Sequence, residues 1–74
     1  MNNNESLDAI RANLQVMYSY IDKAKEDVLT ALLDIQNGNQ NGAIGAIIEV
    51  PDRLEASKAL CEAAMRIHRN SRTF

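Results

Sequence analysis

The sequence predicts an all-α protein, an antiparallel helical hairpin that assembles into a four-helix-bundle-like homodimer. Three observations predict this fold. An apolar line with helical spacing runs from Leu7 to Ile35, a polar segment rich in Asn and Gly follows at 37–42, and helical spacing of apolar and small residues resumes over 43–69. The 74 residues form a single hairpin domain.

The first helix is expected over about residues 5–37. Its apolar line has a mean spacing of 3.5 residues, which is typical of a coiled-coil seam over about four heptads. Asn4 or Ser6 is suited to cap the helix, and residues 1–4 are expected to fray. The charged and polar positions outside the line are interpreted as a solvated face. The line consists of Leu7, Ile10, Leu14, Met17, Ile21, Ala24, Val28, Ala31 and Ile35.

A polar turn is expected at 37–42. Gly38 is a natural residue to follow the helix, because glycine adopts the positive φ that commonly ends helices. Asn41 and Gly42 form a second turn signal. The chain is therefore expected to reverse direction here.

The second helix is expected over about 43–69, with an interruption near 50–52. The β-branched residues of 43–50 could suit a strand, but no second strand is available to pair with it. Pro51 allows two interpretations: a fresh helix at Asp52, whose spacing to Glu55 resembles a capping box, or a kink in one long helix. We favour a kinked or briefly interrupted helix, with residues 70–74 frayed.

The second helix carries more apolar surface than one partner helix can bury. Two apolar lines cover well over half of its circumference after Leu54, so it should contact its own first helix and a helix of another chain. A domain of this size also buries only about 60% of its unfolded surface, which favours oligomerisation. The predicted oligomer core consists of Leu7, Ile10, Leu14, Met17, Ile21, Val28, Ile35, Leu54, Leu60, Cys61 and Ile67.

Composition and charge argue against several classes of protein, among them non-specific DNA-binding proteins and membrane-spanning proteins. With 46% hydrophobic and 24% charged residues, the chain has a globular composition. Residues 1–50 carry three basic and seven acidic side chains, whereas 51–74 carry five basic and three acidic, so non-specific DNA binding by the whole molecule is not expected. One cysteine and no signal or membrane-spanning segment favour a soluble protein of the reducing cytoplasm.

No residue set specifies a catalytic or metal site. Cys61 and His68 lie seven residues apart, about 10 Å along a helix, which is too far for a nucleophile and its base. Cys61 lies among alanines, as a buried structural thiol does. We therefore expect no enzyme, no cofactor and no metal.

Two groups of residues are candidates for binding. Tyr18 and Tyr20 flank the apolar line and could contact a partner, although edge-of-core packing is the simpler explanation. A basic cluster closes the second helix, where cations favour the helix dipole and where arginine could also bind phosphate. The cluster consists of Arg66, His68, Arg69 and Arg72.

Two functions are compatible with these observations. The first is a non-enzymatic homo-oligomer that binds and regulates, inhibits or bridges a protein partner, as short proteins of phages and other mobile elements do. The second is a module that binds RNA or a phosphorylated small ligand through its basic C-terminal ends. Two-helix dimers that bind RNA share the expected architecture, which is an analogy of architecture alone.

Overall fold

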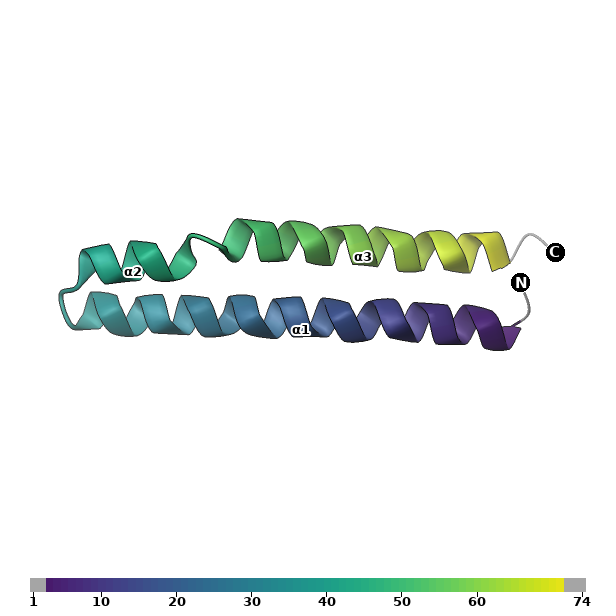
Figure 1. The fold of residues 1–74 in the computed structure, drawn as a ribbon, viewed down its shortest axis with the longest axis horizontal. Coiled ribbons are helices and arrows are strands. Elements are labelled where there is room, and N and C mark those ends of the chain that lie inside the picture. The colour runs from purple at the N-terminus through teal and green to yellow at the C-terminus, as the bar shows by residue number, and fades with distance from the viewer. Residues whose placement is uncertain (1–2, 72–74) are drawn as a thin grey trace.

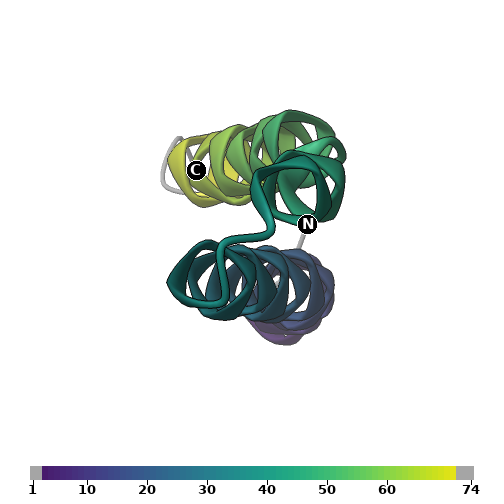
Figure 2. The ribbon, with the colours of Figure 1, turned by 90° about the vertical axis from the view of Figure 1, so that its left-hand side faces the viewer.

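The computed structural model describes residues 3–71 and shows a helical hairpin (Figure 1). Helix α1 spans Asn3–Gln36, α2 spans Gln40–Ile47 and α3 spans Val50–Ser71. Helices α2 and α3 return along α1, so the start of α1 and the end of α3 lie at the same end of the molecule (Figure 1). Seen along its length, the hairpin is two helices thick (Figure 2). The predicted all-α hairpin is confirmed for this part of the chain.

The end of α1 is the predicted glycine stop. Gly38 has a φ of 76°. The backbone N–H of Gly38 donates to the carbonyl oxygen of Ile35 at 3.0 Å, and that of Asn39 donates to the carbonyl oxygen of Asp34 at 2.8 Å. This pair of bonds is a Schellman motif, which satisfies carbonyl groups that the helix end would otherwise leave unpaired.

The turn is shorter than predicted. Helix α2 begins at Gln40, so Asn41 and Gly42 lie inside a helix and form no second turn. Asn39 caps α2, because its side-chain oxygen accepts a hydrogen bond from the backbone N–H of Gly42 at 2.9 Å. A Cβ atom on Gly42 would lie 2.3 Å from the Asn39 side chain, so the glycine makes room for the cap.

The returning arm is helical on both sides of a break, which confirms helix rather than strand for 43–50. The break lies at residues 48 and 49, earlier than the predicted 50–52. Pro51 is the second residue of α3, where its missing N–H sacrifices no hydrogen bond. Asp52 therefore lies within α3, so the alternative of a fresh helix capped by Asp52 is wrong, and the favoured interpretation of a briefly interrupted helix is confirmed.

Both ends of the hairpin are more regular than predicted. Helix α1 already includes residues 3 and 4, and α3 continues through residues 70 and 71, so both helices extend further than predicted. Ser6 lies inside α1 rather than at its first residue, and its hydroxyl is hydrogen-bonded to that of Ser71. The predicted fraying of 1–2 and 72–74 lies outside the described residues.

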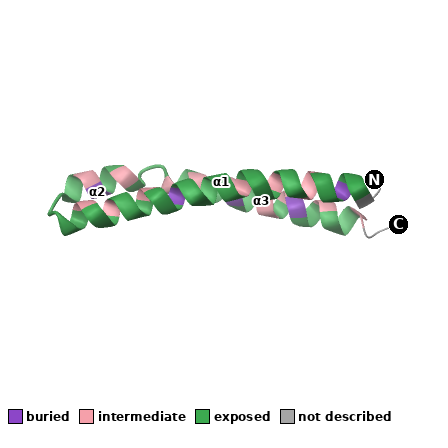
Figure 3. Ribbon diagram, turned by 90° about the horizontal axis from the view of Figure 1, so that it is seen from below, coloured by how far each residue is buried: buried purple, intermediate pink, exposed green. Residues whose placement is uncertain are grey.

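The hairpin contains little core. Within the described chain, no large side chain is fully buried, and the buried apolar residues are Ala24, Ala43 and Ala64. Figure 3 shows short buried and half-buried stretches along ribbons that are otherwise exposed over most of their length. The fully buried part of the contact between the helices therefore consists of small side chains.

Candidate interaction surface

The side of α1 that faces the returning arm is not centred on the predicted apolar line. It is rotated about the helix axis, so that it shares only half of its residues with that line. The buried and half-buried residues follow steps of three and four, as the predicted line does. Every second one, however, is a polar residue that comes one position before the apolar residue of the predicted line. These residues include Ser6, Ile10, Asn13, Met17, Ala24, Asp27, Ala31 and Asp34. About half of the predicted apolar line therefore lies at the edge of the contact with the chain's own second arm and stays at least 43% exposed.

On α3 the contacting side lies between the two predicted apolar lines and takes residues from both. Its central members follow the same alternating spacing, and Val50, Ala56, Cys61 and Ala63 beside them are also half-buried. The central members are Arg53, Ser57, Leu60, Ala64, Ile67 and Ser71. Small and polar residues at four of these six positions explain why the two arms bury so little.

The predicted oligomer core divides into two groups in the hairpin. Five of its members are half-buried: Ile10, Met17, Leu60, Cys61 and Ile67. The other six are between 43% and 58% exposed: Leu7, Leu14, Ile21, Val28, Ile35 and Leu54. The apolar stripe of α1 is wider than a single partner helix can cover, so one edge of it stays in water.

These six exposed side chains, with Leu32, Ile44 and Ile47, form a strip that we call the apolar face. On α1 it repeats every seven residues, so its members lie on one side of the helix. Leu54 lies beside Ile21 and Val28 in a groove of about 460 Å³, and Ile44 and Ile47 lie beside Ile35 in the next groove. The apolar face consists of Leu7, Leu14, Ile21, Val28, Leu32, Ile35, Ile44, Ile47 and Leu54.

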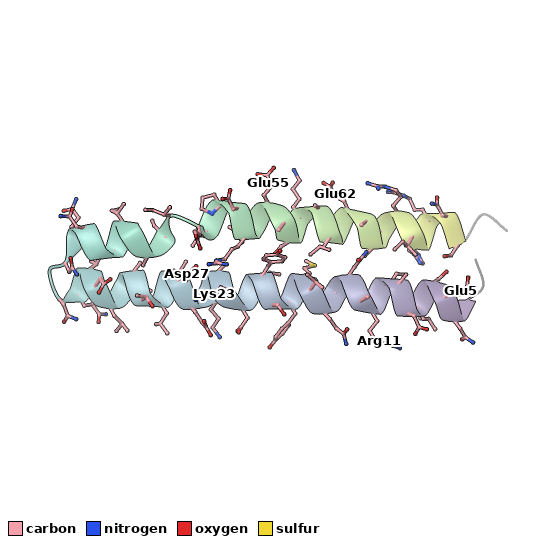
Figure 4. The ribbon with its side chains drawn as sticks, in the orientation of Figure 1. Glu5, Arg11, Lys23, Asp27, Glu55 and Glu62 are labelled. Carbon is pink, nitrogen blue, oxygen red and sulfur yellow. The ribbon has the colours of Figure 1, made fainter. Side chains whose placement is uncertain are left out.

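An ion pair links the two arms. Arg53 Nε donates to Asp27 Oδ2 at 2.9 Å, and the two side chains are only 21% and 15% exposed. Arg53 also binds Glu49 at 2.6 Å, and Lys23 pairs with Asp27 at 3.6 Å along α1. Figure 4 labels Asp27 on the side of α1 that faces α3. One feature of the sequence could have indicated this pair. Arg53 has the same helical spacing as Ser57 and Leu60, so it lies on the side of α3 that faces α1.

The outer sides of both arms are charged, as predicted. Glu55 and Glu62 point away from α1, and Arg11 points away from α3 (Figure 4). Arg11 pairs with Asp8 at 2.9 Å on the exposed side of α1. Exposed pairs of this kind contribute little to stability, so these side chains serve mainly to keep the outer sides in water.

The two tyrosines are not brought together. Tyr18 is 73% exposed and lines a groove with Leu7 and Leu14, at the edge of the apolar face. Tyr20 lies in a separate groove with Lys23 and Arg53. Helical geometry puts this second groove on the opposite side of the contact between α1 and α3. The two rings therefore belong to different surfaces.

The basic cluster lies in the last turns of α3, where Arg66, His68 and Arg69 are exposed. Arg72 lies outside the described residues. Cys61 is a free, half-buried thiol two helical turns before His68. Among residues 3–71, no three or more His, Cys, Asp or Glu side chains gather in a group that could hold a metal ion.

No helix in the described part of the chain combines the length and the apolar character needed to cross a bilayer. Comparison with family models, curated proteins and solved structures finds no match to this chain. The surface itself is therefore the basis for a functional hypothesis.

Proposed function

We propose that the protein is a non-catalytic interaction protein of the cytoplasm. Two copies pair through the apolar face to form a four-helix-bundle homodimer, and the dimer binds and regulates, inhibits or bridges a protein partner. The observation that carries the proposal is the exposed column of Leu7, Leu14, Ile21, Val28 and Ile35. Monomeric proteins rarely expose a contiguous apolar strip of this extent, whereas interaction proteins do.

The exposed area supports pairing. A compact protein of 8.2 kDa has an accessible surface of about 4,500 Å². The hairpin has 5665 Å². The excess of about 1,100 Å² is comparable to the area of about 800 Å² that each partner buries in a standard protein interface. The radius of gyration is 17.0 Å, against about 11 Å for a compact domain of this length, so the hairpin is too elongated to bury as much surface as a compact domain does.

Pairing through the apolar face leaves the opposite side of each hairpin free for a protein partner. The groove around Tyr20 lies there, with Val16, Lys23 and Arg53 among its lining residues. An aromatic ring beside charged side chains is typical of the anchoring residues of protein interfaces. Tyr18 would lie at the rim of the dimer contact, where it could reach either the second copy or the partner.

One observation favours a second function. Arg66, His68 and Arg69 are exposed at the end of α3, and a dimer carries this basic cluster twice. Arginine can bind phosphate groups in a bidentate manner, so RNA or a phosphorylated small ligand is the alternative partner. The attraction between cations and the helix dipole accounts for the same residues without a ligand, which is why we rank this function second.

A capture experiment separates the two functions. Tagged wild-type protein, the double variant Tyr18→Ala and Tyr20→Ala, and the triple variant Arg66→Gln, Arg69→Gln and Arg72→Gln are each purified from the host of origin. We expect the wild type and the triple variant to retain the same protein in stoichiometric amount, and the tyrosine variant to lose it.

The opposite pattern would reverse the ranking. Nucleic acid that absorbs at 260 nm, bound by the wild type and the tyrosine variant but not by the arginine variant, would support the second function. In that case each phosphate contact removed should also reduce the salt dependence of binding by about 0.9 in the log–log slope.

A further inference from the structure

We infer that α1 of one copy packs on α3 of the second copy, with the two-fold axis parallel to the long axis of the bundle. This inference rests on the proposed homodimer and specifies its geometry. Two hairpins that stack through their apolar faces can be related by two kinds of two-fold axis. An axis along the helices sets α1 on the second copy's α3, and an axis across the helices sets α1 on α1 and α3 on α3.

The charges of the helices favour the first arrangement. Helix α1 carries six acidic and three basic side chains, a net charge of −3. Helix α3 carries three acidic and four basic side chains, a net charge of +1 with neutral histidine. Packing α1 on α3 therefore joins helices of opposite charge, whereas packing α1 on α1 joins two acidic helices along 34 residues.

The side-chain volumes favour the same arrangement. The exposed column of α1 is made of leucine, isoleucine and valine throughout. On α3, Leu54 shares the apolar face, and Cys61 and His68 follow it at seven-residue spacing on the same side. Pairing α1 with α3 sets the bulkier column against the one that contains Cys61, which keeps all helix spacings similar. Pairing α1 with α1 and α3 with α3 of the second copy sets bulky residues against bulky ones in one half of the core only. The spacing between helices would then differ between the two halves.

The register of the hairpin identifies the residues that meet. The hydrogen bond between Ser6 and Ser71 puts these two positions at the same height. Since the arms are antiparallel, Leu14 lies level with residue 63, and an axis along the helices preserves this height in the second copy. Leu14 therefore lies within about 3 Å, along the axis, of the second copy's Cys61. By the same reasoning, Ile21 lies level with residue 56 and equally close to the second copy's Leu54.

Single-thiol chains test the arrangement by cross-linking. The wild type has its only thiol at Cys61, and the double variant Leu14→Cys with Cys61→Ala has its only thiol at residue 14, so every cross-link joins two chains. We expect a short bis-maleimide to link the two co-expressed chains roughly tenfold more than it links either chain alone, because the thiols are held close together. Ile21→Cys and Leu54→Cys, each with Cys61→Ala, provide a second pair with the same expected result.

The outcomes that overturn the inference are distinct from failure of the proposed function. In the other arrangement Ile21 approaches its own symmetry mate, so efficient self-linking of the Ile21→Cys, Cys61→Ala chain would overturn the α1-on-α3 packing. A stable dimer in which neither mixed pair links would also overturn it. Both results would leave the homodimer in place, whereas light scattering that showed only monomer would remove the homodimer itself.

Discussion

Replacing Ile21 by Asp should break the homodimer while changing the hairpin itself much less. Ile21 lies at the middle of the apolar face and is 43% exposed. Burying a whole isoleucine side chain contributes about 2–3 kcal/mol, so burying the 43% that the hairpin leaves exposed contributes about 1 kcal/mol per copy of the dimer. An unpaired polar group buried in its place costs about 1–3 kcal/mol more. With two copies in each dimer, the sum of at least about 4 kcal/mol raises the dissociation constant about 10³-fold.

Sedimentation equilibrium over a range of concentrations measures this change. Leu33→Asp is the matched control, since Leu33 is also on α1 and is 51% exposed but lies on the outer side, away from the grooves of the apolar face. We expect the control to keep the dissociation constant of the wild type within about threefold, the usual range for surface substitutions. Equal dissociation constants for the two aspartate variants would refute the assignment of the apolar face.

Three further changes test the hairpin. Asp27→Asn should lower the free energy of unfolding by about 1–2 kcal/mol in urea titration, because the Asp27–Arg53 pair between the arms is only 15–21% exposed and Arg53 then keeps Glu49 of its own arm as a carboxylate partner. Glu26→Gln, on the exposed side, should change the free energy of unfolding by less than about 0.5 kcal/mol. Gly45→Ala should raise the free energy of unfolding by about 0.5–1 kcal/mol, because alanine favours the helix more than glycine does and a Cβ atom at this position meets no other atom. A lower thermal midpoint would contradict this. Gly38→Ala should destabilise by about 1–2 kcal/mol, because its φ of 76° strains any residue with a Cβ atom; an unchanged midpoint would show that the turn rearranges.

The elements of the fold could be predicted from local patterns. The alternating apolar line was enough to predict α1 as one long helix, and Gly38 marked its end because only a residue that tolerates positive φ completes the Schellman motif. The break before α3 was misplaced by about two residues. Pro51 signals a boundary, but proline is equally at home in the first turn of a helix, so the sequence alone does not locate the break.

The pairing of the arms could not be predicted from those patterns. A stripe of apolar residues shows which side of α1 is buried in the assembly, but not which edge of the stripe faces the same chain. The structure turns Asn13 and Asp27 toward α3 and leaves Leu14 and Val28 at the surface. The Asp27–Arg53 pair depends on a register between distant segments, which local spacing does not encode.

The central claim is that a second copy of the chain covers the apolar face. The most direct measurement is the molar mass of the untagged protein by light scattering at micromolar concentration, with circular dichroism on the same sample. We expect a helical species of twice the chain mass of 8.2 kDa, which falls toward the single-chain mass in Ile21→Asp but not in Leu33→Asp. A stable, folded, wild-type monomer would contradict the account.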